Sequence, residues 1–87
     1  MKYSATIYIM PRPEILDPQG KATLKGLSNL GFDSFEGVRI GKRIELVLSA
    51  ANEEEASNMV QEACKKLLAN TVIEEFTFEL KQLAEVS

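Results

Sequence analysis

At 87 residues the chain has room for a single domain, residues 1–87. Its content of 45% hydrophobic and 26% charged residues is ordinary for a globular protein, which excludes the disordered, fibrous and membrane-spanning classes of protein. Histidine is absent and Cys64 is the single cysteine, so an internal disulfide is impossible and metal or proton-shuttle chemistry has few groups to use. The net charge of -3 argues against nucleic-acid binding, which needs a clustered basic face, and with no export signal we expect a cytoplasmic location.

The first predicted element is a strand from Tyr3 to Met10, where side chains alternate between two faces. One of these faces would carry Tyr3, Ala5, Ile7 and Ile9. Pro11-Arg12-Pro13 then ends the strand, because proline has no backbone N–H to donate to a neighbouring strand.

A helix is predicted next, from Pro18 to about Leu30. Asp17 precedes it as an N-cap whose carboxylate accepts from the free N–H groups of the first turn, and proline loses nothing at the first helical position. Gly31 can end the helix in the left-handed conformation, with Phe32 folding back onto the last turn.

Residues 35–40 and 44–48 are apolar at alternate positions and flank Gly41-Lys42-Arg43, which predicts two strands joined by a three-residue hairpin loop. The hairpin register would set two pairs opposite each other: Arg39 with Glu45, and Val38 with Leu46. The same stretch also fits one long bent strand with a bulge near the glycine, the arrangement needed for exchanging segments with a second copy. The sequence leaves both arrangements open.

A second helix is predicted to begin at Asn52, which with Glu55 forms a capping-box-like start. An apolar stripe at helical spacing follows, made of Ala56, Met59, Val60, Ala63, Cys64, Leu67 and Leu68. Asn70 can close this helix in the left-handed region. We interpret Cys64, in the middle of the stripe, as a buried packing residue rather than a nucleophile.

The last predicted strand alternates from Phe76 to Leu80, with a loose tail after Lys81. The element order is therefore βαββαβ, an α+β fold related to ferredoxin-like folds, with two helices on one face of an antiparallel sheet. The other face, carrying Tyr8, Met10 and Val47, would need cover, so we expect the chain to dimerise through the sheet.

Two short segments are candidates for contact with other proteins. Gln19 and Gly20 occupy the first helical turn, where better helix formers are usual, and the glycine would let another backbone come close. Arg39 and Lys42 place two cations beside Gly41, which suits an anion or an acidic partner. A permissive turn and a solvated hairpin tip are the simpler readings. Asp17 is interpreted as a helix cap rather than as one of a pair of catalytic acids.

Three segments together resemble the PurS family, the small subunits of phosphoribosylformylglycinamidine (FGAM) synthase. These segments are Ile15-Leu16-Asp17-Pro18-Gln19-Gly20, Val38-Arg39-Ile40-Gly41-Lys42 and the run from Cys64 to Glu74. The resemblance covers nearly the whole chain, in order and spacing. Two departures stand out: Thr71 occupies a position that is commonly proline, and Pro11-Arg12-Pro13 replaces the usual lysine-containing link, with Arg12 the nearest substitute.

The resemblance implies a complex of purine biosynthesis that converts ATP, glutamine and formylglycinamide ribonucleotide into the amidine, ADP, phosphate and glutamate. The small subunit implied is a homodimer that is not catalytic alone and holds no cofactor or metal. It bridges the synthetase (PurL), which uses ATP and Mg²⁺, and the glutaminase (PurQ). Residues expected at partner or dimer surfaces are Asp17, Gln19, Gly20, Arg39, Gly41, Lys42, Asn70 and Glu74.

The runner-up hypothesis is a regulatory module that binds a small ligand, because such modules share the βαββαβ order. They usually bind amino acids near the first strand–helix link. Binding of amino acids or nucleotides by the isolated chain would favour this alternative, whereas a pure adaptor should bind none of them tightly.

Overall fold

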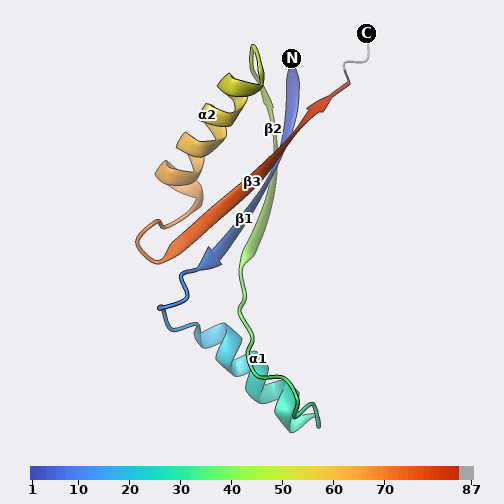
Figure 1. Ribbon diagram of the computed structural model, residues 1–87, viewed down its shortest axis with the longest axis vertical. Helices are drawn as coiled ribbons and strands as arrows, with labels where there is room; N and C mark the ends of the chain where they lie inside the picture. Colours follow the sequence, from blue (N-terminus) through green and yellow to red (C-terminus); the bar gives the residue numbers. More distant parts are fainter. Residues whose placement is uncertain (85–87) are drawn as a thin grey trace.

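The computed structural model describes residues 1–84. Figure 1 shows the elements in order: β1 (Lys2–Pro11), α1 (Pro18–Asn29), β2 (Lys42–Ser49), α2 (Glu53–Ala63), the π-helical turn η1 (Cys64–Leu68) and β3 (Glu74–Leu83). The strands form an antiparallel sheet in the order β2-β1-β3. The α+β class and the antiparallel sheet are therefore confirmed. None of the helices in this part of the chain is long and apolar enough to cross a membrane.

The core lies between α2 and one face of the sheet. β1 is the central strand, and its alternation buries the predicted residues Tyr3, Ala5, Ile7 and Ile9. Ile7 pairs with Ile44 on β2 and with Phe78 on β3, so the apolar face continues across the sheet. Ala56, Val60 and Cys64 cover this face from the helical side and are fully or almost fully buried. Burial of these side chains is the main source of stability.

The second helix begins as predicted but ends differently. The Asn52 side chain accepts from the Glu55 N–H at 2.8 Å. No residue other than glycine has a positive φ among those described, so the predicted left-handed Asn70 is wrong. Instead η1 widens the last turn, and the Ala69 N–H bonds the Cys64 carbonyl at 2.9 Å. The Asn70 side chain accepts from the Val72 N–H at 3.2 Å, which stabilises a turn toward β3.

The predicted apolar stripe of this helix is too wide. Met59 and Leu67 remain 43% and 84% exposed, while Val60 next to Met59 is buried and Leu68 next to Leu67 is partly buried. The loose tail is also placed too early, because β3 continues through Leu83, opposite Lys2. The remainder of the predicted tail, residues 85–87, lies outside the described residues.

The first helix forms where the sequence predicts it. Asp17 is its N-cap and Pro18 its first residue. At the other end Gly31 has φ +96°, and the Phe32 N–H bonds the Leu27 carbonyl at 3.0 Å. This is the predicted left-handed ending, with the chain folded back onto the last turn.

The position of α1 is the main departure from the predicted fold. Figure 1 shows α1 beyond the end of the sheet rather than on its face, and within residues 1–84 only α2 packs against the strands to a significant extent. The radius of gyration is 17.1 Å, whereas a compact chain of this length has about 12 Å. We call residues 12–41, which contain α1 and the extended segment after it, the arm.

The predicted hairpin at Gly41 does not form. Residues 35–41 are extended without a turn and lead directly into β2, so the pairings of Arg39 with Glu45 and Val38 with Leu46 do not occur within the chain. The alternative of one long bent strand with a bulge near Gly41 is correct in that the chain does not fold back, but the strand itself begins only at Lys42. Consequently the sheet lacks both the extra strand and the second helix of the predicted βαββαβ unit.

The second face of the sheet is uncovered, as expected. Tyr8 and Val47 are 38% and 65% exposed on it. Because α2 lies on the opposite face, this surface is available to another molecule.

Substitutions at adjacent helical positions test which face of α2 is buried. Val60→Ala should lower the free energy of unfolding by on the order of 2 kcal/mol, because it leaves a cavity against Ile7 and its neighbours. Met59→Ala should change it by less than about 0.5 kcal/mol. Urea denaturation followed by circular dichroism measures both, and equal effects would show that the helix is turned differently.

Candidate functional site

The eight residues predicted at partner surfaces gather at one place, the junction between the arm and the end of the sheet. We call this region, residues 11–20, 38–42 and 70–74, the joint. It encloses a cavity of about 210 Å³ lined by Pro11, Ile15, Leu16, Asp17, Pro18, Gln19, Ile40, Gly41, Lys42, Ile73 and Glu74. Three segments distant in sequence therefore meet here, although no single motif indicates it.

Asp17 is the most highly connected side chain of the joint. Its Oδ1 accepts from the Gly20 N–H at 3.0 Å, which caps α1. Its Oδ2 accepts from the Ile40 N–H at 2.9 Å, which ties the helix to the extended segment. These backbone donors, first Gly20 and then Ile40, hold the pKa of the Asp17 carboxyl below its ordinary value of 3.8.

Two glycines allow the backbones of the joint to approach each other. A Cβ on Gly20 would overlap the Val38 carbonyl oxygen, so a backbone does come close at this position, and it belongs to the same chain. A Cβ on Gly41 would overlap the Ile9 carbonyl and the sulfur of Met10. Glycine is therefore required at position 41 because a side chain would not fit there, and not because the backbone turns.

The charged residues of the joint bind to neighbouring parts of the same chain. The Arg39 guanidinium donates to the Pro11 carbonyl. Lys42 Nζ lies 3.6 Å from Glu74 Oε2, and Glu74 Oε1 accepts from the Asn70 N–H at 2.8 Å. The ion pair involves an exposed lysine, so its contribution to stability is small; it links the starts of β2 and β3, which lie on either side of β1.

The joint is suited to docking rather than to chemistry. Its cavity is smaller than the roughly 300 Å³ typical of small-molecule sites and matches one side chain of a protein partner. It does lie at the first strand–helix link, where an amino-acid module would bind its ligand, but both oxygens of Asp17 are already bonded. Cys64 lies in the core, where burial raises the pKa of its thiol. Residues 1–84 contain no group of three or more possible metal ligands.

Comparison with known proteins identifies the family. The family model for phosphoribosylformylglycinamidine (FGAM) synthase, PurS, matches residues 4–82. This chain belongs to the PurS family. It is 49% identical to the PurS subunit of Synechocystis sp. over 93% of this chain and 81% of that protein.

Solved PurS structures have the same fold. One is Methanocaldococcus jannaschii PurS, one of the subunits of formylglycinamide ribonucleotide amidotransferase in the purine biosynthetic pathway, with a TM-score of 0.83 and 34% identity, covering 94% of this chain and 99% of that one. Another is a chain of PurLQS from Thermotoga maritima, with a TM-score of 0.85 and 30% identity, covering 93% and 99%.

Arg12 and Thr71, the positions at which the sequence is expected to depart from the family it resembles, contact each other. Arg12 donates to the Thr71 carbonyl from Nε at 3.2 Å and from a terminal nitrogen at 2.7 Å. Sequence reasoning missed this contact, because it joins residues 59 positions apart. The arginine thus ties down the turn before β3, at which a proline would otherwise restrict the backbone.

A pair of glycine substitutions in α1 tests the close approach at the joint. Gly26→Ala should stabilise the PurS-family chain by about 1 kcal/mol, because its Cβ meets nothing within 4 Å and alanine favours helix. Gly20→Ala should destabilise it, because its Cβ overlaps Val38. Thermal unfolding of both variants measures the difference, and stabilisation by both would contradict the contact.

The hydrogen bonds to Asp17 predict its titration. Its lowered pKa means that its contribution to stability is complete above the unfolded pKa of about 3.9 and is lost as the pH falls through the folded pKa. NMR of the side-chain carboxyl carbon should give a midpoint below 3.8 in the native protein and about 3.9 in denaturant. A native midpoint at or above the denatured value would rule out the two-donor arrangement.

Proposed function

We propose that this chain is the non-catalytic bridging subunit of an FGAM synthase, docking a glutaminase subunit (PurQ) to an ATP-dependent synthetase subunit (PurL). The observation that carries the proposal is the likeness to a chain of Thermotoga maritima PurLQS over 93% of the present chain. The joint and the uncovered sheet face support it, because both offer contact surfaces and neither offers a reactive group. ATP and Mg²⁺ would act at the synthetase, in the cytoplasm.

A bridge has a clear physical task in such a complex. Ammonia released from glutamine must reach an activated amide on another enzyme before it escapes into water and is protonated. Fixing the two enzymes relative to each other converts an encounter in solution into a transfer over a fixed path. The bridging chain raises the rate by positioning alone and needs no catalytic side chain.

Reconstitution tests the bridging role. The purified chain alone should show neither ATP hydrolysis nor glutaminase activity. Added to the synthetase and glutaminase subunits, it should restore glutamine-dependent amidine synthesis, while synthesis from ammonium chloride should not depend on it. Failure to restore the glutamine-dependent reaction with enzymes that remain active on ammonia would overturn the proposal.

The proposed bridge is a homodimer in which the arms are exchanged. The Ala50 N–H donates to the Met1 carbonyl at 2.9 Å. Because hydrogen bonding alternates along an antiparallel strand, the even-numbered residues of β2 direct their backbone N–H and C=O groups toward β1. The odd-numbered residues then turn theirs to the outer edge. Beyond the sheet the Ile40 N–H also points inward, to Asp17, so the same outer edge continues along the arm.

A second copy can pair with this outer edge about a two-fold axis near Lys42. The register expected for a hairpin is then formed between chains, with Arg39 opposite Glu45 of the partner subunit. The apolar Val38 and Ile40 would extend the core face of the partner's sheet. The partner's α1 would supply the second helix that each sheet lacks, which accounts for a helix α1 that does not pack against the strands of its own chain.

Charge reversal tests pairing between chains. Arg39→Glu and Glu45→Arg should each weaken the dimer, because like charges then face each other across the outer edge. Mixing the two single variants should restore association as a heterodimer, since both pairs across the interface become opposite in charge. Native mass spectrometry identifies the heterodimer. A hairpin within one chain could not be rescued by mixing, so homodimers and heterodimers in statistical proportion would contradict the exchange.

A further inference from the structure

The end of β1 leaves an unpaired backbone edge. The pairing of β1 with β2 ends at Ile9 opposite Lys42, but the extended segment that contains β2 continues outward to residue 35. The inward-facing backbone groups of Val38 and Ile40 therefore lie beyond the pairs that β1 forms with β2. Unpaired edge groups of this kind attract other strands and must be bonded or covered.

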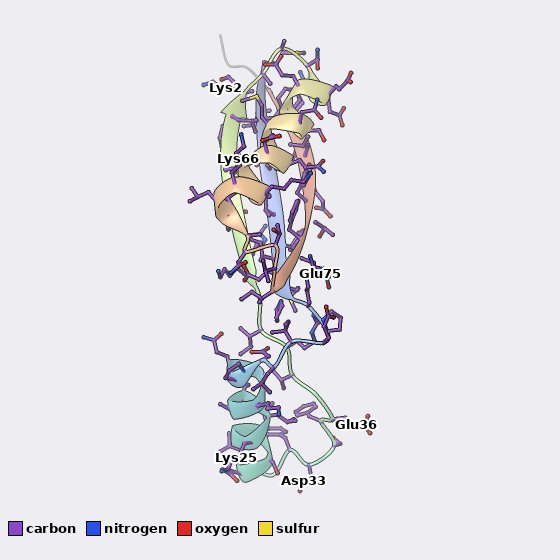
Figure 2. The ribbon with its side chains drawn as sticks, turned by 90° about the vertical axis from the view of Figure 1, so that its left-hand side faces the viewer. Lys2, Lys25, Asp33, Glu36, Lys66 and Glu75 are labelled. Carbon is purple, nitrogen blue, oxygen red and sulfur yellow. The ribbon has the colours of Figure 1, made fainter. Side chains whose placement is uncertain are left out.

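The start of α1 covers this edge. Asp17 Oδ2 accepts from the Ile40 N–H at 2.9 Å, and the backbone of Gly20 lies directly against the Val38 carbonyl. The same carboxylate caps α1 through Oδ1. Figures 1 and 2 both show α1 lying alongside the extended segment that follows it, so the helix and the segment run together away from the sheet.

We infer that Asp17 is a positioning residue that replaces β1 as the partner of residues 38–40 and thereby fixes the direction of the arm. Its carboxylate accepts one hydrogen bond from the first turn of α1 and one from the edge of the extended segment. The edge of residues 38–40 that faces α1 is thereby closed, so pairing with a strand of another chain is directed to the opposite, outer edge. The Arg39 bond to the Pro11 carbonyl holds the same segment to the end of β1. The effect on assembly rests on the proposed dimer, whereas the effect on the arm itself does not.

Asp17→Asn separates the two roles of this side chain. Asparagine is a good N-cap, but its amide places an NH2 group, which cannot accept, where one of the two carboxylate oxygens lies, so in this geometry it can accept from the Gly20 N–H or from the Ile40 N–H but not from both. The matched control is Asn52→Ser at the start of α2, where the side chain accepts from the Glu55 N–H and the change preserves a capping residue. Both variants should keep the helix content of the original chain by circular dichroism.

The direction of the arm is measured by pulsed electron spin resonance between labels at Lys25 on α1 and Lys66 on η1. Figure 2 shows Lys25 near the tip of the arm and Lys66 beside the sheet, far apart along the long axis of the molecule. Dilution with unlabelled chain restricts the signal to distances within one chain. The original protein and Asn52→Ser should give one narrow distance distribution, whereas Asp17→Asn should give a broad one.

Dimerisation should weaken in Asp17→Asn together with the loss of a defined arm direction. Loss of a hydrogen bond to a charged group corresponds to roughly a tenfold or greater increase in the dimer dissociation constant of Asp17→Asn, measured by sedimentation equilibrium. An Asp17→Asn protein with the original distance distribution and dissociation constant would overturn the inference. A monomeric original protein would instead contradict the proposed dimer, and the distance distributions would still decide the role of Asp17.

Discussion

The straight course of the chain from residue 35 through Ser49 is the constraint on which the rest of the structure depends. A turn at Gly41 would fold the arm back onto its own sheet and close a small ferredoxin-like unit. Because the chain does not turn, the outer edge of β2 and one face of the sheet stay uncovered, and α1 lies beyond the end of the strands. Each of these surfaces is a place where another chain can bind.

Local signals in the sequence predict the elements well. Alternating apolar side chains predict β1, and capping residues predict the two ends of α1; each of these signals spans only a few neighbouring residues. The structure has both elements where they are expected. Gly41 misleads, because a glycine between two apolar runs usually marks a turn, whereas here it is required by the nearby Ile9 carbonyl and Met10 sulfur. That requirement is not local, so the sequence pattern alone could not reveal it.

At the candidate site, too, the local features could be predicted from the sequence, whereas the contacts between distant residues could not. Asp17 could be assigned as a helix cap from the proline after it, but its second bond, to Ile40, joins residues 23 positions apart. The contact between Arg12 and Thr71 is more distant still. The family resemblance brought the residues of the joint together as a group, and the structure supplies the physical reason, since they tie together the ends of the sheet and the arm.

In the proposed dimer the chain acts through shared surfaces, and residues 35–40 pair with β2 of a second copy. Isotope-filtered NMR on an equal mixture of ¹³C-labelled and unlabelled chains tests this most directly. The account predicts nuclear Overhauser contacts between the methyl groups of Val38 and Leu46 in the filtered spectrum, which reports only contacts between chains. The same contacts in a uniformly labelled sample, but absent from the filtered spectrum, would show a closed hairpin and contradict it.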